Sequence, residues 1–335
     1  MEICTESVFC REYGIIKEED FPKKALRQVL LDDILNDGAF LREKRKREKN
    51  GRNRVFCRKR YMKECGRRNN MFTIREYVKV SSLEEAYELN QKKANVVFGG
   101  GVWLRLGRKN IQTAIDLSGL GLDEITEDEK EFSVGCMVSL RQLETHKGID
   151  AYTKGAVKES LRHIVGVQMR NCATVGGSIY GRFGFSDILC CLLGLDCDVE
   201  LYKQGRMPLA DFAKMKKDND ILVRVIIKKT PLETVYLSQR NTETDFPVVS
   251  CAVTKDAEGY YAVIGARPCQ PVVVRDSEGI LAKAEVTAED LAAFASKVQN
   301  GMDFADNTRC SGAYRRHVAG VLVKRGLKQL MGGDK

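Results

Sequence analysis

The sequence predicts an α+β protein of two or three compact units, and three observations support this fold class. Its 335 residues are enough for more than one hydrophobic core. From Met71 onward, strand-like and helix-like segments follow each other, and the first of them have a β-α-β order. The C-terminal part instead places several strands before two helices, which is typical of a separate, smaller α+β unit.

The first subdomain is predicted at residues 71–121. Phe72 to Val80 alternates like a strand, and the segment from Ser82 to Glu85 is a capping box that opens a helix ending near Lys92. Two short apolar strands follow, at residues 95–98 and 111–117. This order predicts a small parallel sheet.

The second subdomain is predicted at residues 122–232, and a C-terminal domain at residues 233–335. The second subdomain has strands at 131–135, 173–180, 198–202 and 221–228, and helices at 139–145, 152–164 and 186–195. A glycine pair interrupts the strand predicted at 173–180. The C-terminal domain has strands at 234–239, 248–254 and 260–266, and helices at 288–298 and 312–330.

Residues 1–70 form a leader that differs in composition from the rest. Between Arg42 and Arg68, fourteen basic residues face three acidic ones, so this stretch carries +11 and the remaining chain about −2 of the net +9. Such a segment cannot bury a core, which predicts a solvated, disordered tail; electrostatic binding of nucleic acid is the less favoured alternative. A third interpretation is a start codon assigned too early, because Arg67-Arg68-Asn69-Asn70 before Met71 can be encoded by a purine-rich ribosome-binding tract.

Cysteine spacing and hydropathy exclude several protein classes. The twelve cysteines contain no CxxC pair, so we expect reduced thiols, mostly in the core, and no metal or iron–sulfur cluster on this chain. No apolar run approaches the ~18 residues of a membrane span, and Met1 to Gly14 lacks a signal-peptide core. The sequence therefore predicts a cytoplasmic protein with no membrane partner.

The first candidate site is a glycine turn directly after an apolar strand. Glycine permits positive φ, and successive backbone N–H groups in such a turn form a concave site for a pyrophosphate. The spacing does not match the GxGxxG of a Rossmann fingerprint, and a simple tight turn is the alternative. The turn and its strand comprise Val96, Val97, Phe98, Gly99, Gly100, Gly101, Val102 and Trp103.

The second candidate site is a glycine pair inside the predicted strand at 173–180. Gly176 and Gly177 indicate close approach of a ligand or of another backbone. Thr174 and Ser178 add hydroxyl groups suited to phosphate or ribityl oxygens. Asp187 follows at the start of a helix, where a capping role is the simpler interpretation. Two such turns together suggest one extended phosphate-bearing ligand held between two subdomains.

At these residues the sequence resembles the FAD-binding subunits of the xanthine dehydrogenase and carbon-monoxide dehydrogenase family. The family's first loop, AGGTDL, is matched by Phe98 to Trp103, and its second, RNxATIGGN, by Arg170 to Ser178. The family's SDL aligns with Ser186 to Ile188, and weaker matches lie at Ile115 to Ser118, 132–135 and 313–316. The resemblance covers Met71 to Leu330 and leaves out the leader. It implies a p-cresol-methylhydroxylase-type FAD-binding domain of two subdomains plus the small α+β C-terminal domain.

The resemblance also implies which residues bind FAD. Beyond the loop from Val96 to Trp103, they would be Ile164, Thr174, Gly176, Gly177, Ser178, Asp187 and Leu222. The sequence departs from the family at three places. Gly101 and Val102 replace a threonine and an aspartate, Ser178 replaces an asparagine, and a lysine that some relatives use near the flavin falls near Tyr236. These departures affect side-chain contacts, whereas contacts from the backbone would survive them.

The resemblance implies that the chain relays electrons, and xanthine dehydrogenase is the enzyme type that it favours. A molybdopterin-binding subunit would oxidise the substrate, a 2Fe–2S subunit would pass electrons to FAD, and NAD⁺ or another acceptor would receive them. No catalytic acid or base is then needed on this chain, whose only histidines are His146, His163 and His317.

Three other functions stay open. They are a stand-alone FAD oxidoreductase of the same fold, a non-catalytic binding module whose leader contacts RNA, and a nucleotide-binding protein that takes NAD instead of FAD. The sequence does not determine the substrate, the electron acceptor, the stoichiometry of the complex or whether residues 1–70 are translated.

Overall fold

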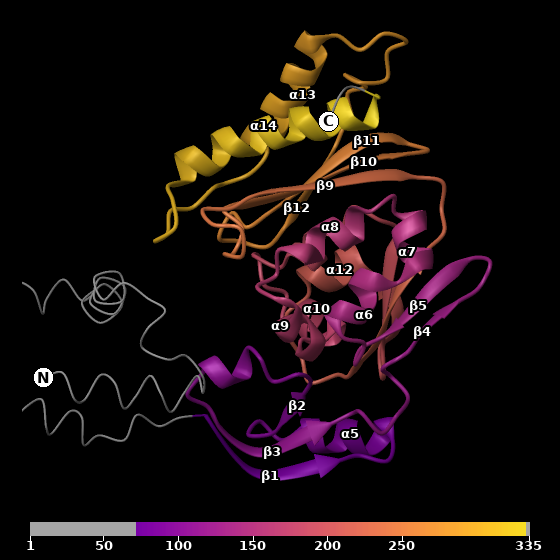
Figure 1. Ribbon diagram of the computed structural model, residues 1–335, viewed down its shortest axis with the longest axis vertical. Helices are drawn as coiled ribbons and strands as arrows, with labels where there is room; N and C mark the ends of the chain where they lie inside the picture. The colour runs from indigo at the N-terminus through magenta and orange to yellow at the C-terminus, as the bar shows by residue number, and fades with distance from the viewer. Residues whose placement is uncertain (1–71, 333–335) are drawn as a thin grey trace, which may run out of the picture. The chain divides into compact units, whose positions relative to one another are not determined.

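The computed structural model describes residues 72–332, and the predictions for residues 1–70 lie outside this range. The described chain contains three sheets and their helices, which confirms the α+β class (Figure 1). Among these residues no helix is both long and apolar enough to cross a membrane.

The first sheet is parallel and small. Its strands β1 (Thr73–Lys79), β2 (Val96–Phe98) and β3 (Asn110–Asp116) lie in the order β1-β3-β2. Helix α5 (Leu83–Asn90) joins β1 to β2 and begins at Ser82, whose side chain accepts a hydrogen bond from the backbone N–H of Glu85. The predicted β-α-β beginning is therefore confirmed.

The second sheet is antiparallel and has the order β4-β5-β8-β6-β7. Its strands are β4 (Ile125–Glu127), β5 (Glu131–Gly135), β6 (Cys197–Leu201), β7 (Gly205–Pro208) and β8 (Leu222–Lys228). Between β5 and β6 the chain forms a series of short helices, and α12 (Leu209–Lys214) follows β7. The helices between β5 and β6 are α6 (Leu140–Thr145), α7 (Lys147–Tyr152), α8 (Ala156–Arg162), α9 (Val167–Cys172), α10 (Val175–Tyr180) and α11 (Asp187–Leu192).

Two predictions for this region are wrong. Residues 173–180 form no strand, because Thr174 caps helix α10 by accepting a hydrogen bond from the backbone N–H of Gly177. The helix predicted at 152–164 is shorter, because only α8 lies within this range. Tyr152 ends α7, and Lys154 and Gly155 adopt positive φ angles of 47° and 87° before α8 begins. Such angles cannot belong to a right-handed helix.

The third sheet is antiparallel, with the order β12-β11-β10-β9. It consists of β9 (Glu233–Gln239), β10 (Val249–Asp256), β11 (Gly259–Gly265) and β12 (Val272–Arg275), and the last of these was not predicted. Helices α13 (Ala288–Asn300) and α14 (Gly312–Leu330) pack together, and α14 lies against β9 and β10 (Figure 1).

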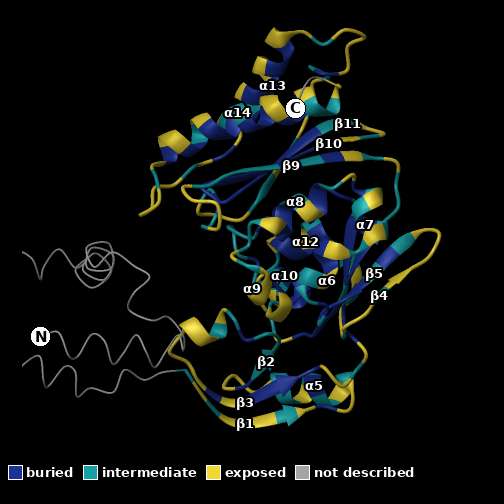
Figure 2. Cartoon of the chain, in the orientation of Figure 1, coloured by how far each residue is buried: buried dark blue, intermediate teal, exposed yellow. Residues whose placement is uncertain are grey.

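Strands β10 and β11, in the middle of this third sheet, are buried on both faces over most of their length (Figure 2). Cys251 and Val253 of β10 belong to a core shared with α13 and α14, whereas Ala252 between them belongs to the core around the second sheet. Alternate residues of a strand point to opposite faces, so β10 takes part in two cores at once. Helices α8 and α11 contact the face that carries Ala252.

Most described cysteines are core residues, as predicted. Eight thiols lie in the described range, and five of them are buried: Cys136, Cys190, Cys191, Cys197 and Cys251. Burial raises the pKa of the Cys136 thiol to about 12, so this thiol stays protonated at neutral pH. These cysteines act as small apolar side chains.

Candidate cofactor site

The two glycine turns predicted from the sequence lie against each other. A Cβ atom placed on Gly100 would lie 1.6 Å from the carbonyl oxygen of Cys172, and one on Gly99 would lie 2.6 Å from Oγ1 of Thr174. No side chain larger than hydrogen fits at Gly100 without moving a backbone. The glycines of the first turn therefore allow close contact with the second turn.

The first turn also offers several backbone donors. The N–H groups of Gly99, Gly100 and Gly101 have no acceptor among the residues that the structure describes. Gly101 adopts a φ of 68°, a conformation that glycine takes without strain. Its carbonyl accepts a hydrogen bond of 3.0 Å from the N–H of Arg105, at the short 3₁₀-helix η2 (Leu104–Leu106). Adjacent N–H donors of this kind suit an anion.

Apolar residues of β2 and the carboxylate of Asp116 hold the first turn in place. Val96, Val97 and Phe98 are half-buried in β2, Val102 is also half-buried, and β2 pairs with β3. Asp116 closes β3 by accepting hydrogen bonds from the N–H and the hydroxyl of Ser118 at 2.9 and 2.7 Å. Burial alone would raise the pKa of Asp116, but hydrogen bonds from Tyr77 and Ser118 hold it below its ordinary value.

In the second turn, the hydroxyl groups take part in local hydrogen bonds. Oγ1 of Thr174 accepts from the N–H of Gly177 at 3.2 Å, and the hydroxyl of Ser178 donates to the Thr174 carbonyl at 2.9 Å. A Cβ on Gly176 would lie 2.6 Å from the carbonyl oxygen of Cys136, whereas one on Gly177 would meet only Oγ1 of Thr174, at 3.1 Å. Of the two glycines, Gly177 is the one that faces open space.

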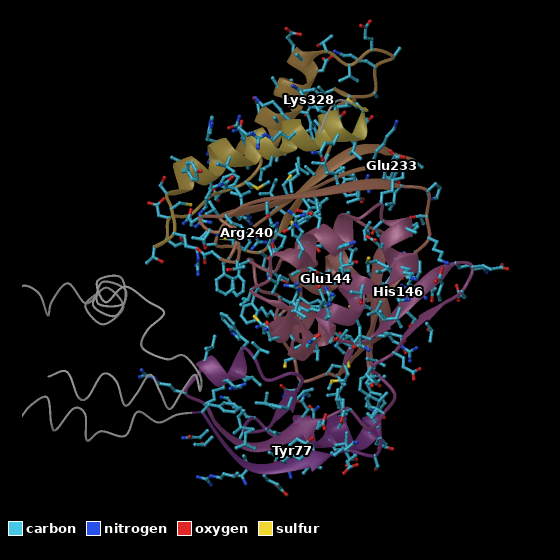
Figure 3. All side chains as sticks on the ribbon, in the orientation of Figure 1. Tyr77, Glu144, His146, Glu233, Arg240 and Lys328 are labelled. Carbon is cyan, nitrogen blue, oxygen red and sulfur yellow. The ribbon has the colours of Figure 1, made fainter. Side chains whose placement is uncertain are left out.

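Arg170, the first residue of the second motif, has a structural role. Its Nε donates to the carboxylate of Glu144 at 2.8 Å, and both side chains are buried (Figure 3 labels Glu144). Its Nη1 donates to the carbonyl of Ile164 at 3.1 Å. Arg170 thus ties α9 to α6 and fixes the half-buried Ile164 just before the exposed Val165, whose φ is 47°.

Asp187 lies in a buried polar cluster and is not the helix cap. Ser186 caps α11, and Asp187 is its first residue. Its Oδ1 accepts hydrogen bonds of 2.5 Å from the Tyr236 hydroxyl and from Nη2 of Arg240, labelled in Figure 3. Burial raises the pKa of Asp187 to about 6, against the opposing effects of Arg240 and Tyr236.

The remaining predicted residue, Leu222, is a core residue at the start of β8. Its side chain is 5% exposed and packs in the core around the second sheet. Leu222 pairs with Leu201 of β6. Strand β8, which begins at Leu222, contacts helix α10.

Sequence reasoning missed an aromatic cluster beside the first turn. Trp103 lies 5.4 Å from both Phe183 and Phe185 and 6.0 Å from Phe246, measured between ring centroids. Trp103 is 45% exposed although it packs against three rings. The two phenylalanines flanking Gly184, just before Ser186-Asp187, were a visible pattern, whereas Phe246 is distant in sequence. An exposed aromatic surface next to backbone donors suits a ligand with a planar ring and a phosphate.

These observations fit FAD. The first turn supplies three adjacent backbone donors for phosphate oxygens, Gly177 leaves room at the second turn, and Trp103 offers a ring for stacking. The departures noted in the sequence affect side chains at Gly101, Val102 and Ser178, and none removes a backbone donor.

Two family models match the chain in succession. The FAD-binding domain of molybdopterin dehydrogenases matches residues 70–230, and the C-terminal domain of the CO dehydrogenase flavoprotein matches residues 234–330. Together they cover all three sheets. Both glycine turns and Asp187 lie inside the first match.

Relatives and solved structures agree with these matches. The YgfM protein of Escherichia coli K12, itself uncharacterized, is 27% identical over 252 residues, which are 74% of this chain and 93% of YgfM. The alpha subunit of the 6-hydroxypseudooxynicotine dehydrogenase complex of Paenarthrobacter nicotinovorans is 23% identical over 281 residues, covering 76% of this chain and 94% of that subunit. A chain of quinoline 2-oxidoreductase from Pseudomonas putida 86 has the same fold, with a TM-score of 0.69 at 18% identity over 77% of this chain and 97% of its own.

Proposed function

Because the chain belongs to the family of FAD-binding subunits of molybdenum hydroxylases, we propose that it relays electrons within such a complex. A separate 2Fe–2S subunit supplies the electrons, after a molybdopterin-binding subunit has oxidised the substrate. NAD⁺ or another acceptor receives them. We further propose a complex of the xanthine dehydrogenase type. The observation that carries the relay function is the contact between the two glycine turns, which creates one site rich in backbone donors.

We assign the FAD to the residues around that contact. The pyrophosphate takes the N–H groups of the first turn, and Gly177 gives the second turn room to approach it. Asp187, Ile164 and Leu222 form the surrounding wall. The complete proposed set is Val96, Val97, Phe98, Gly99, Gly100, Gly101, Val102, Trp103, Ile164, Thr174, Gly176, Gly177, Ser178, Asp187 and Leu222.

The bound FAD supplies the redox chemistry, since flavins exchange electrons singly and in pairs. The chain's own residues bind and orient it. The Arg170–Glu144 ion pair holds the second turn, and the cluster of Asp187, Tyr236 and Arg240 fixes the start of α11. The aromatic rings beside Trp103 keep water from one side of the site.

The three sheets have different proposed roles. We assign FAD binding to residues 71–232, with subdomains at 71–121 and 122–232, and a supporting role to residues 233–335. The C-terminal domain contributes to the site through Tyr236 and Arg240, both of which reach Asp187.

A flavin spectrum of the purified full-length chain tests FAD binding. After incubation with FAD and removal of excess, about one flavin per chain should remain. A protein without flavin bands after this treatment would instead support the non-catalytic binding module. Retention of NAD in place of FAD would favour the nucleotide-binding alternative.

Turnover of the isolated chain distinguishes a relay subunit from a stand-alone oxidoreductase. The FAD-loaded chain should not reduce NAD⁺ with xanthine as substrate, whereas the complex purified with its partner subunits should do so. Substrate oxidation by the chain alone would contradict the relay function. A complex that oxidises a different substrate would retain the relay function and reject only the xanthine dehydrogenase type.

A further inference from the structure

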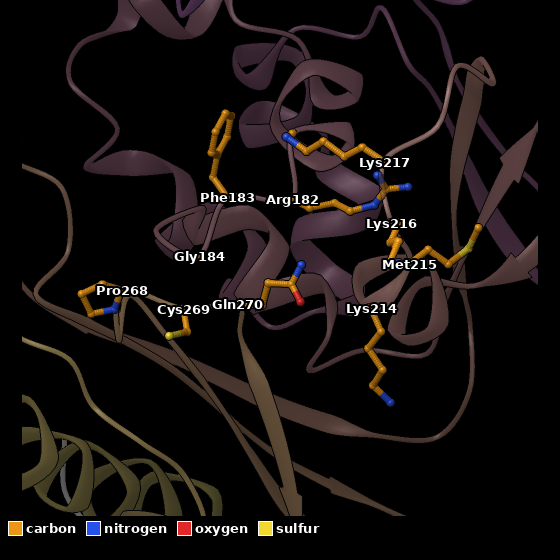
Figure 4. Close-up of a pocket in the computed structure, with 11 residues that line it drawn as sticks. Arg182, Phe183, Gly184, Lys214, Met215, Lys216, Lys217, Pro268, Cys269 and Gln270 are labelled. Carbon is orange, nitrogen blue, oxygen red and sulfur yellow. The ribbon is translucent and has the colours of Figure 1, made fainter.

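A hollow of about 490 Å³ lies next to the aromatic cluster and outside the proposed FAD site. Its volume is within the range of about 300–1,000 Å³ that is usual for small-molecule sites. Three segments form its walls: the turn after α10, the segment from Lys214 to Lys217 after α12, and the loop of residues 268–270 after β11 (Figure 4). We call it the Arg182 pocket.

Arg182 is the unusual residue of this pocket. Its side chain is 4% exposed, and its Nε donates to the carbonyl of Phe212 at 2.9 Å. Its Nη1 and Nη2 are buried and have no hydrogen-bond partner among the described residues. The guanidinium lies over the Phe212 ring, with Cζ 3.9 Å from the ring centroid. Buried donors without acceptors cost free energy, so a fold that retains them has usually reserved them for a ligand or an ordered water.

The charges around Arg182 are mostly of the same sign. Lys214, Lys216 and Lys217 also line the pocket. Burial lowers the pKa of Lys217, and Arg182 and Lys109 lower it further. Asp218 is the nearby acid, but its side chain accepts a hydrogen bond of 2.6 Å from the Gln204 amide. An anion in the pocket would relieve this repulsion.

The backbone conformation of Arg182 is strained. Its φ is 49°, in the left-handed region that residues with a Cβ seldom adopt. Gly181 and Gly184 stand on either side of this position, yet the chain has arginine here. The strain is consistent with a role for the guanidinium itself.

We propose that the Arg182 pocket binds the phosphate of a ligand through Nη1 and Nη2 of Arg182. The planar guanidinium presents two parallel donors that match two phosphate oxygens, and the lysines add positive charge. Phe183 lines the pocket and also packs on Trp103. Because the FAD pyrophosphate is assigned to the first glycine turn, the phosphate in this pocket belongs to a second phosphate-bearing molecule that binds beside the FAD.

Titration calorimetry with inorganic pyrophosphate and with FAD tests this assignment. The proteins are the full-length chain, Arg182→Met, and the control Lys324→Gln, which removes an exposed charge on α14. If the phosphate belongs to a second molecule, the FAD-loaded chain binds pyrophosphate, and Arg182→Met weakens that binding roughly ten- to hundredfold. Weaker FAD binding in Arg182→Met, with no pyrophosphate binding to the FAD-loaded chain, would instead place the FAD pyrophosphate in this pocket and overturn the proposal. Lys324→Gln should change neither affinity.

Unchanged affinities for both ligands in folded Arg182→Met would overturn the proposal. If this variant does not fold, the double variant Lys216→Gln/Lys217→Gln tests the same pocket. It should lower the affinity for pyrophosphate. The pocket can also be tested if the chain binds no FAD, because pyrophosphate binding to the FAD-free chain should still depend on Arg182. Its failure is therefore distinguishable from failure of the proposed electron relay.

Discussion

Gly100 and Gly177 belong to the same site, but a side chain at each would meet different neighbours. At Gly100 it would strike the carbonyl of Cys172, so this glycine is required for the two turns to pack. At Gly177 it would meet only the Thr174 hydroxyl, at 3.1 Å, and otherwise point into open space. The first glycine therefore serves folding, and the second leaves room for a ligand.

Alanine at each position should separate these two requirements. Gly177→Ala should change the unfolding free energy by no more than about 1 kcal/mol, because alanine favours the helix that begins here. It should nevertheless lower FAD affinity at least about tenfold, since the methyl group enters the space assigned to phosphate. Gly100→Ala should lower the unfolding free energy by about 1–3 kcal/mol and should also lower FAD affinity. Urea unfolding and FAD titration measure both effects. Full FAD affinity in Gly177→Ala would place the phosphate elsewhere.

The buried cluster at Asp187 predicts a pH-dependent effect. Its pKa is raised to about 6 in the folded protein, so Asp187 is mostly protonated at pH 5 and mostly ionised at pH 7. Because the pKa of Asp187 is higher in the folded protein, the contribution of protonated Asp187 to the unfolding free energy is present at low pH. This contribution is lost as the pH rises through about 6. The Tyr236 hydroxyl donates to this carboxylate and favours its charged form.

Tyr236→Phe should therefore be more harmful at pH 7 than at pH 5. At pH 7 the variant leaves a buried carboxylate with one donor fewer, which should cost about 1–3 kcal/mol of unfolding free energy. At pH 5 the penalty should be smaller. Tyr260→Phe on β11, which is not buried, serves as the control. Equal penalties at both pH values would show that Asp187 does not titrate between them.

Sequence reasoning identified residues of the site but not all of their partners. Asp187 followed from a short motif, whereas Arg240 stands far from it in the sequence, and only the packing of the third sheet on α11 brings the two together. The same holds for Trp103 and Phe246. Local patterns predict what a turn can bind, but they cannot predict which distant side chains surround it.

At the scale of elements, the strands were easier to predict than the helices around the site. Strands β1, β3, β9, β10 and β11 all lie where the sequence predicts strands. The apolar run around Gly176 and Gly177 also resembled a strand, but the Thr174 cap and the close approach of Gly176 to Cys136 select a helix. Tertiary contacts outweigh local propensity where a segment is this short.

One backbone carbonyl group joins the end of α11 to the third sheet. The backbone oxygen of Gly194, after α11, accepts hydrogen bonds from Thr254 at 2.6 Å, Thr234 at 2.9 Å and Tyr261 at 3.1 Å. These donors come from β10, β9 and β11, so the end of α11 is bound to three strands. A carbonyl oxygen has two lone pairs, and three donors exceed what it needs.

We therefore expect the hydroxyl groups to substitute for one another. Thr254→Val alone should cost about 1 kcal/mol or less of unfolding free energy, because Thr234 and Tyr261 still satisfy the carbonyl. Thr254→Val combined with Thr234→Val and Tyr261→Phe should cost more than the sum of the single variants, since the buried oxygen then has no donor among these three. Urea unfolding of the series measures the difference. Strict additivity would show that the three bonds act independently.

At the scale of the whole molecule, every proposed FAD contact lies between Val96 and Leu222. Its outer support, Tyr236 and Arg240, comes from the start of the third sheet. Both family matches begin at residue 70 or later. The basic stretch from Arg42 to Arg68 lies outside both matches.

A chain that begins at Met71 should therefore bind FAD as tightly as the full-length chain. If the basic stretch binds nucleic acid, the full-length chain should in addition bind a polyanion in a strongly salt-dependent way, and the shorter chain should not. Calorimetric titrations with FAD and with single-stranded RNA at two salt concentrations test both statements. Loss of FAD binding in the shorter chain would assign the leader a part in the site. Intact-mass measurement of the protein from its native host tests the start codon itself.

Trp103 is the only tryptophan in the sequence, and it stands in the turn assigned to the cofactor. Tryptophan emission from this protein therefore has a single source, within the aromatic cluster formed with Phe183, Phe185 and Phe246. A flavin bound in contact with that ring would accept its excitation energy and quench the emission. The chain consequently carries an intrinsic optical reporter of its own site, and a fluorescence titration can follow cofactor binding and release without any label.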